Sequence, residues 1–357
     1  MFVAWRDLVH AKGRFALMGT VIVLITLLVG LLSGLTAGLG RQNVSAVTGL
    51  PADHVAFAAP AGDRELSYAD SAVTEAQWRR WAAAPGVTSA EPLGITTTKA
   101  SAGDRSAGVS VFGVRPGSAL APDGGSLEDD AVVLSVPAAA ELGVRAGDDV
   151  VLAGRRLAVA AVSGDASYSH TPVVWATLDV WRAAAPPDRP FATVIALITS
   201  SADLAATDRT TGTRTVTKDE SLAAIGSYAS ENGSLQLMRG FLFAISALVI
   251  GAFFTVWTIQ RSADVAVLKA LGASTTWLLR DALGQAVVLL VGGTLVGTGL
   301  AAGLGAALAG SAIPFVLTPA TVLGPAAVTV LLGALGAALA IRRITSVDPL
   351  TALGSAR

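Results

Sequence analysis

Three long intervals without a charged residue constrain the fold of this chain more than any other feature. They are residues 15–40, 240–260 and 282–341, which are 26, 21 and 60 residues long. A helix that spans a membrane needs about 20 consecutive apolar residues. The first two intervals therefore hold one span each, and the third is long enough for two spans with a turn between them.

Three prolines, Pro314, Pro319 and Pro325, mark the turn in the last interval, because proline lacks the backbone donor that a helix interior needs. A composition of 52% hydrophobic and 14% charged residues agrees with an integral membrane protein. The first span is too long for the apolar core of a signal peptide, so we expect it to be retained. The predicted spans are 15–39, 236–260, 282–309 and 321–341, with a short exterior loop at 310–320.

Positive charges set the predicted orientation, because short cytoplasmic segments are enriched in Lys and Arg. Such residues lie before the first span (Arg6, Lys12, Arg14), between the second and third (Arg261, Lys269, Arg280) and after the fourth (Arg342, Arg343, Arg357). The N-terminal segment 1–14, the loop 261–281 and the tail 342–357 are thus predicted to be cytoplasmic. Residues 40–235 are then extracellular, and their 22 acidic and 15 basic residues do not favour nucleic-acid binding.

The extracellular segment 40–235 is predicted to be a mixed α/β domain. TEAQWRRWAAAPGV begins at Thr74, which can cap a helix, and ends at Pro85 and Gly86. DDAVVLS, GDDVVLAGRRLAVAAVSG and TPVVWATLDVW are β-branched runs that read as strands. The predicted fold class is therefore a membrane α-helical protein with four transmembrane helices (1+3) and a mixed α/β extracellular domain between helices 1 and 2.

Several enzymatic motifs are absent from the sequence. It contains no G-x-x-x-x-G-K-[ST] phosphate loop, no cysteine and only three scattered histidines, His10, His54 and His170. The predicted spans also lack a buried Asp, Glu or Lys that could relay protons. We therefore expect a chain that is not an enzyme by itself, with energy for any transport supplied by a partner.

The cytoplasmic loop QRSADVAVLKALGASTTWLLRDALGQ carries the strongest local signal. Apolar residues from Ala263 to Leu271 have helical spacing, and Gly272 can end the helix in a left-handed conformation. An amphipathic connector on the membrane surface would have the same pattern.

LKALGAST after an R-x-x-D start resembles the cytoplasmic loop of the FtsX-like and MacB-like permeases, the membrane subunits of type VII ABC transporters. The amphipathic N-terminal segment MFVAWRDLVHAKGRF, the 1+3 order of spans and the closing DPLTAL are similar to that family as well. LGVRAGDDVVLAGRRLAVAAV resembles the small β subdomain of its exterior domain.

The resemblance implies a homodimer in a bacterial plasma membrane, in contact with membrane lipid and paired with two copies of a cytoplasmic ABC ATPase that binds ATP and Mg²⁺. No intrinsic cofactor is implied. The loop from Asp264 to Ala273 would be the helix that couples to the ATPase. Its implied coupling residues are Asp264, Leu268, Lys269, Leu271 and Gly272.

GSYASENGSLQLMRG, which leads into the second span, resembles the corresponding segment of small Gram-positive permeases that include the haem-exporting HrtB type. Haem is then the expected transported ligand. Glu231, Tyr228 and Met238 are candidate iron ligands, and Arg239 could pair with a propionate. A separation of seven residues places Glu231 and Met238 about 10 Å apart along a helix, too far for two axial ligands of one iron. A dimer interface, or a chain unwound at Asn232 and Gly233, would allow both.

Ordinary structural roles explain the same residues. A methionine often fills a gap in a packed core, a glutamate near a helix start interacts favourably with the positive end of the helix dipole, and an arginine near a membrane reaches the lipid headgroups. Two other functions are also open. One is export of a different amphipathic molecule, such as a lipid, peptide or antibiotic, and the other is mechanical activation of an extracellular partner. For any exported molecule, the apolar part of a lateral cleft could be lined by Met18, Val29, Leu32 and Leu35.

Overall fold

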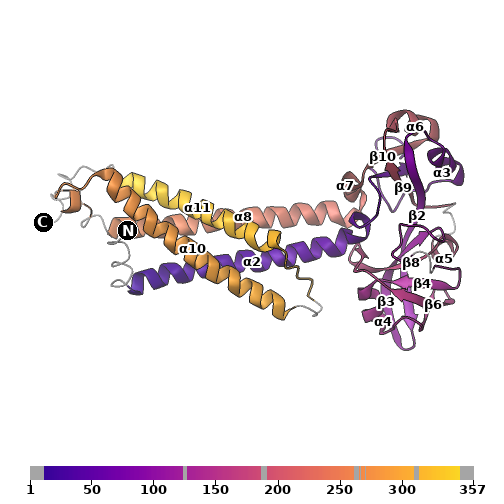
Figure 1. Cartoon of the computed structure of the whole chain (residues 1–357), viewed down its shortest axis with the longest axis horizontal. Coiled ribbons are helices and arrows are strands. Elements are labelled where there is room, and N and C mark those ends of the chain that lie inside the picture. Colours follow the sequence, from indigo (N-terminus) through magenta and orange to yellow (C-terminus); the bar gives the residue numbers. More distant parts are fainter. Residues whose placement is uncertain are drawn as a thin grey trace. The chain divides into compact units, whose positions relative to one another are not determined.

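The computed structural model describes residues 12–123, 127–185, 191–260, 265, 267–269, 271–308 and 313–345. These residues form two compact units. The helical unit takes its residues from the chain up to Gly38 and from Ser234 onward, and the α/β unit comprises Leu39–Gly233. Helices α2 (Lys12–Thr48) and α8 (Gly226–Gln260) contribute residues to both units (Figure 1).

Within the described residues, four helices are long and apolar enough to cross a membrane. They are α2, α8, α10 (Thr275–Ala307) and α11 (Pro319–Thr345), and every strand lies between α2 and α8 in the sequence. The predicted fold class, with its 1+3 order and its α/β domain, is confirmed. The predicted domain limits and the side of the membrane remain predictions, because the length of a helix does not fix where a bilayer lies.

Glycines let α10 approach α2 closely in the helical unit. A methyl group added at Gly297 would lie 2.6 Å from the carbonyl oxygen of Val23, and one at Gly293 would lie 2.7 Å from Ile22. Small residues at such positions allow van der Waals contact between helices where no hydrophobic driving force exists. Met18 and Val29, considered above for a lateral cleft, are instead buried, with 5% and 1% of their surfaces exposed.

Phe315, in the segment between α10 and α11, occupies a space left by two glycines. A methyl group at Gly34 of α2 or at Gly305 of α10 would overlap its ring. The backbone N–H of Val316 also donates to the carbonyl oxygen of Gly34 over 3.1 Å. The ring therefore fastens the end of α10 to α2. Pro319 is the first residue of α11, whereas Pro325 lies inside that helix and not in the turn.

A four-stranded antiparallel sheet forms one part of the α/β unit. Its order is β10 (Thr213–Thr217), β1 (His54–Ala58), β9 (Val194–Thr199) and β2 (Val87–Ala102). Helix α3 (Glu75–Ala82) lies against β2, and helix α6 (Leu204–Thr211) lies against β10. The predicted start of α3 is confirmed, because Thr74 and Gln77 form a reciprocal capping box. Trp81 of α3 is fully buried and donates from Nε1 to Oγ1 of Thr213 over 3.0 Å.

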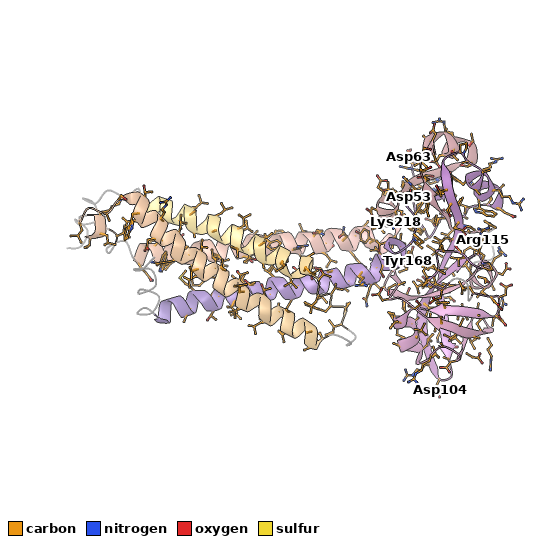
Figure 2. The ribbon with its side chains drawn as sticks, in the orientation of Figure 1. Asp53, Asp63, Asp104, Arg115, Tyr168 and Lys218 are labelled. Atoms are coloured by element: carbon orange, nitrogen blue, oxygen red, sulfur yellow. The ribbon has the colours of Figure 1, made fainter. Side chains whose placement is uncertain are left out.

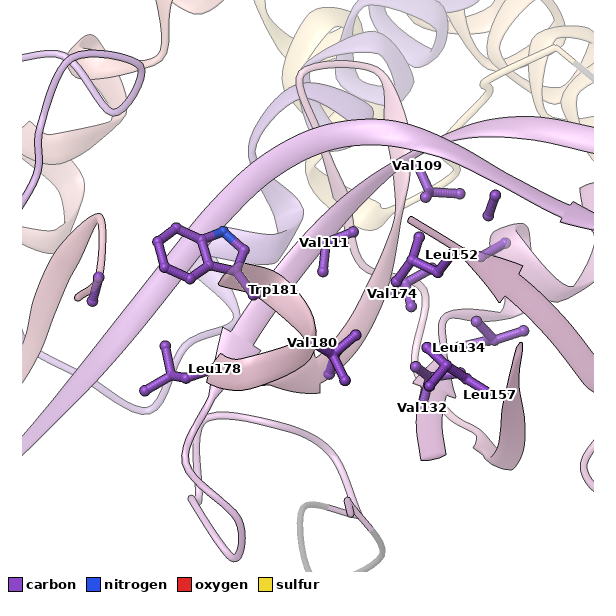
Figure 3. Packing of buried hydrophobic residues seen from close by; sticks show 14 of the residues in the cluster. Val109, Val111, Val132, Leu134, Leu152, Leu157, Val174, Leu178, Val180 and Trp181 are labelled. Carbon is purple, nitrogen blue, oxygen red and sulfur yellow. The ribbon is translucent and has the colours of Figure 1, made fainter. Parts of the chain in front are cut away.

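A closed ring of six strands forms the second part of this unit. From β2 it runs through β3 (Arg105–Val114), β8 (Thr171–Thr177), β4 (Ala131–Leu134), β6 (Arg155–Val162) and β5 (Asp149–Leu152), which pairs again with β2. Closure removes free strand edges. Side chains of this ring and of α4 (Val136–Leu142) and α5 (Leu178–Ala184) form a hydrophobic cluster, shown in Figure 3.

One predicted strand is partly wrong. TPVVWATLDVW was expected to be extended throughout, but β8 ends at Thr177 and the following residues form α5. The reason is a local cap: Oγ1 of Thr177 accepts a hydrogen bond from the backbone N–H of Val180. The helix then buries Val180 and Trp181 in the hydrophobic cluster. The remaining elements are β7 (Ser167–Tyr168), α7 (Lys218–Ser221) and the 3₁₀ turn η2 (Leu222–Ala224).

Some predictions fall on residues outside the described ranges. They concern Asp264, residues 1–11 of the N-terminal segment, residues 310–312 of the short loop and residues 346–357 of the C-terminal tail.

Candidate functional site

Three segments of the α/β unit meet around Glu231, near the start of α8. The other two are the last turns of α2 and the hairpin formed by β7 and β8. The hairpin lies against α2 through main-chain hydrogen bonds, in which Ser169 donates to the carbonyl oxygen of Asn43 over 2.9 Å and His170 to that of Gln42 over 3.2 Å. These bonds place the side chain of His170 beside α8.

Glu231 accepts two hydrogen bonds on the same carboxylate oxygen. Nε2 of His170 lies 2.7 Å from Oε2, and Nδ2 of Asn43 lies 3.0 Å from Oε2. Asn43 is buried, whereas the side chains of His170 and Glu231 are 33% and 43% exposed. The carboxylate is therefore held from two directions while part of it remains open to solvent.

Two serines extend these contacts into a closed circuit of side chains. Oγ of Ser227 donates to Oδ1 of Asn43 over 3.1 Å, and Oγ of Ser169 lies 3.3 Å from Oγ of Ser227. Ser227 and Glu231 are four residues apart, so they share one face of α8. Because Ser169 and His170 are neighbours in the turn, the circuit links α2, α8 and the hairpin.

The hairpin itself is anchored by an aromatic cluster. Tyr168, labelled in Figure 2, packs edge-on against Tyr68 and Phe112, with ring centroids 6.0 and 5.6 Å away. On the other side of the turn, Oγ1 of Thr171 donates to the carbonyl oxygen of Tyr168 over 2.8 Å. Two residues before Asn43 on α2, the guanidinium of Arg41 pairs with the carboxylate of Asp165. The segment that carries His170 is thus fixed at several points.

The other predicted haem ligands are not brought into this circuit. Tyr228 is partly buried and packs against the hydrophobic cluster that includes Ile225. Met238 is 48% exposed, and the guanidinium of Arg239 lies over the ring of Phe243, 5.8 Å from its centroid. Haem binding by the predicted residues stays a prediction.

Helix α8 is continuous through Asn232 and Gly233. The possibility that the chain unwinds there is therefore wrong. In a regular α-helix, Glu231 and Met238 are about 10 Å apart along the axis, so one copy of the helix does not offer both to a single iron.

The helical turn of the predicted coupling segment ends at Gly272 in a left-handed conformation, as the sequence predicted. Gly272 has a φ of 94°, and its N–H donates to the carbonyl oxygen of Lys269 over 3.0 Å. The N–H of Ala273 donates to the carbonyl oxygen of Leu268 over 2.9 Å, which completes a Schellman motif. Leu271 is 79% exposed, so its apolar side chain is presented outward at the end of this turn.

Sequence reasoning missed His170 and Asn43. The sequence contains only three scattered histidines, and nothing near His170 predicts its place in a hairpin turn. Ser169 and His170 both have positive φ, 47° and 64°, where a two-residue hairpin usually carries Asn-Gly. These conformations are visible only in the structure, because Ser-His is not a favoured pair for such a turn and no β-branched residue directly precedes it. No sequence signal points to Asn43 either.

Comparison with known proteins relates the whole chain to membrane permeases. Residues 237–349 match the FtsX-like permease C-terminal family. The chain is 25% identical over 360 residues to a Staphylococcus haemolyticus protein named as a hemin transport system permease, HrtB, with 99% of each chain covered. It is 26% identical over 370 residues to an uncharacterized ABC transporter permease of Mycobacterium tuberculosis, again with 99% of each chain covered.

Among solved structures, the extracellular domain of the ABC-type transporter YknZ from Gram-positive bacteria matches with 15% identity and a TM-score of 0.35. This match covers 46% of the present chain and 97% of that domain. Residues 237–349 are thus an FtsX-like permease domain, and over its whole length the chain is similar to permeases of ABC transporters.

Proposed function

We propose that this chain is the membrane subunit of a haem efflux pump. The chain would take haem from the outer leaflet and expel it, using ATP hydrolysed by a separate cytoplasmic subunit. The observation that carries the proposal is the similarity to the staphylococcal hemin permease, which extends over 99% of both chains. The partners are a second copy of this chain and two copies of the ATPase.

The residues near the start of α8 supply chemistry that suits haem. Glu231 and Tyr228 offer oxygen ligands for iron, Met238 offers a sulfur ligand, and Arg239 offers a cation for a propionate. Because α8 is continuous, Glu231 and Met238 would hold the same iron only if they came from two copies of the chain. This part of the proposal therefore requires the homodimer.

The coupling role rests on the turn that ends at Gly272. Leu268, Lys269 and Leu271 lie in or next to the Schellman motif, and the high exposure of Leu271 leaves an apolar side chain available for a partner. In the proposal this turn enters the ATPase, with Asp264 at its beginning. Closure of the ATPase on ATP would then move the helices. Both termini would lie in the cytoplasm and the α/β unit outside.

Hemin titration of the detergent-purified chain tests the proposal. We expect a Soret shift that saturates, and weaker binding or a changed Soret position in Glu231→Ala and Met238→Ala. Glu141→Ala, an exposed carboxylate on α4, and Leu248→Ala, which is 73% exposed on α8, are matched controls. An absent shift in the unaltered chain would refute the haem proposal and favour another amphipathic cargo or a mechanical role. Identical hemin titration curves for all four variants would refute Glu231 and Met238 as iron ligands.

A further inference from the structure

The turn that carries His170 has an unusual backbone for the residues it contains. Ser169 and His170 both adopt left-handed conformations, which favour Gly or Asn. Such strain persists where surrounding contacts hold it in place, and it often accompanies a functional side chain. Here the contacts are the two main-chain bonds to α2 and the packing of Tyr168. The turn thus keeps an imidazole where a glycine would fit with less strain.

The imidazole and the buried amide of Asn43 converge on one oxygen of Glu231. Oε2 receives both hydrogen bonds, at 2.7 and 3.0 Å, whereas Oε1 has no hydrogen-bond partner among the described residues. A carboxylate fixed through one oxygen presents the other in a defined direction. In metal sites, groups that do not bind the metal themselves orient a ligand in this way and thereby affect the affinity of the site for the metal.

Stability alone is a weak reason for the contact between His170 and Glu231. Both side chains are about one-third or more exposed, and ion pairs at such positions contribute little to folding because water screens them. Asn43, in contrast, is 1% exposed and satisfied at both ends by Ser227 and Glu231. The buried amide therefore belongs to the fold, and the exposed imidazole requires another explanation.

We propose that His170 is a positioning residue for the cargo ligand: with Asn43 it fixes Oε2 of Glu231, so that Oε1 is presented to the haem iron. The inference rests on the proposed haem function. It assigns no iron bond to His170 itself. The hairpin then belongs to the binding site, although it is 61 residues away from Glu231 in the sequence.

His170→Gly provides the sharpest test, because glycine removes the imidazole while favouring the left-handed turn. We expect its dissociation constant for hemin to rise about 10-fold or more, as when an outer hydrogen-bond partner of a metal ligand is removed. The Soret band should also move, which a purely structural change would not cause. His170→Gln retains a side-chain donor and should restore most of the affinity and the original band.

The outcomes separate the two proposals. Unaltered hemin affinity and an unaltered Soret band in His170→Gly, together with weakened binding in Glu231→Ala, would overturn the positioning role and leave the haem function intact. No hemin binding by the unaltered chain would overturn the haem function, and the positioning role with it. His54→Gly, a histidine at the start of β1, controls for loss of an imidazole elsewhere in the same unit, and circular dichroism checks that each variant is folded.

Discussion

Asn43 joins α2 to α8 through a partly buried hydrogen bond of 3.0 Å from its Nδ2 to Oε2 of Glu231. Replacement by leucine, which has a similar volume, would leave the hydroxyl of Ser227 without its acceptor and Glu231 without one donor. Hydrogen bonds between partly buried groups such as these contribute about 1 kcal/mol each. We therefore expect Asn43→Leu to lower the Tm of the purified chain, followed by tryptophan fluorescence. Gln42→Leu, next to it on α2, should have a smaller effect, and equal effects would contradict the role of the hydrogen bond.

The ring of Phe315 makes Gly34 intolerant of a side chain. Alanine normally stabilises a helix relative to glycine by about 1 kcal/mol. At Gly34, however, the added methyl group would overlap Phe315, and overpacking of this kind costs about 1–3 kcal/mol. Gly34→Ala should lower the Tm in detergent, whereas Gly19→Ala on the same helix, with nothing within 4 Å of the added methyl group, should raise or preserve it. Similar shifts in the two variants would argue against a close fit of Phe315.

Leu271 offers a test of coupling that is separate from folding. Because the side chain is 79% exposed, Leu271→Ala should leave the Tm of the isolated chain unchanged. If the side chain inserts into the ATPase as an interface anchor, its loss should cost about 2 kcal/mol, or roughly 30-fold in affinity. ATPase activity titrated with the purified permease measures this change. Leu248→Ala, which is 73% exposed on α8, serves as the control, and equal activation by both variants would contradict the proposed contact.

Tyr68 makes the stability of the α/β unit sensitive to alkaline pH. Burial raises the pKa of its phenol well above the usual value, and this effect outweighs the opposing hydrogen bond to Oγ of Ser221, 2.9 Å away. An unfolded tyrosine titrates near pH 10. The stability that comes from the neutral phenol is therefore complete below about pH 10 and is lost as the pH rises above it.

The unaltered chain should thus lose Tm more steeply than Tyr68→Phe as the pH rises from about 10 to about 12. Near neutral pH the variant should be less stable by about 1 kcal/mol, because it lacks the hydrogen bond to Ser221. Thermal unfolding across this pH range, with tyrosinate absorbance recorded on the folded protein, measures both effects. Parallel Tm curves for the two proteins would contradict the raised pKa.

The uncharged intervals alone predicted four long helices and their 1+3 order, because a segment without charges that is about 20 residues long has few alternatives to spanning a membrane. Local rules also predicted the helix start at Thr74 and the helix end at Gly272, since each depends on residues within one turn of the chain. The same rules failed at Thr177, where TPVVWATLDVW reads as one strand but a cap and the burial of Trp181 favour a helix.

The surroundings of Glu231 were decided only by the tertiary structure. Its partners Asn43 and His170 are 188 and 61 residues away, and no local spacing encodes a hydrogen bond across such separations. They meet because the hairpin after β7 is fastened both to α2 by main-chain bonds and to the domain core by Tyr168. The sequence by itself determined that Glu231 stands at the entrance to an apolar helix. Folding of three distant segments determined which of its oxygens is held and which is open.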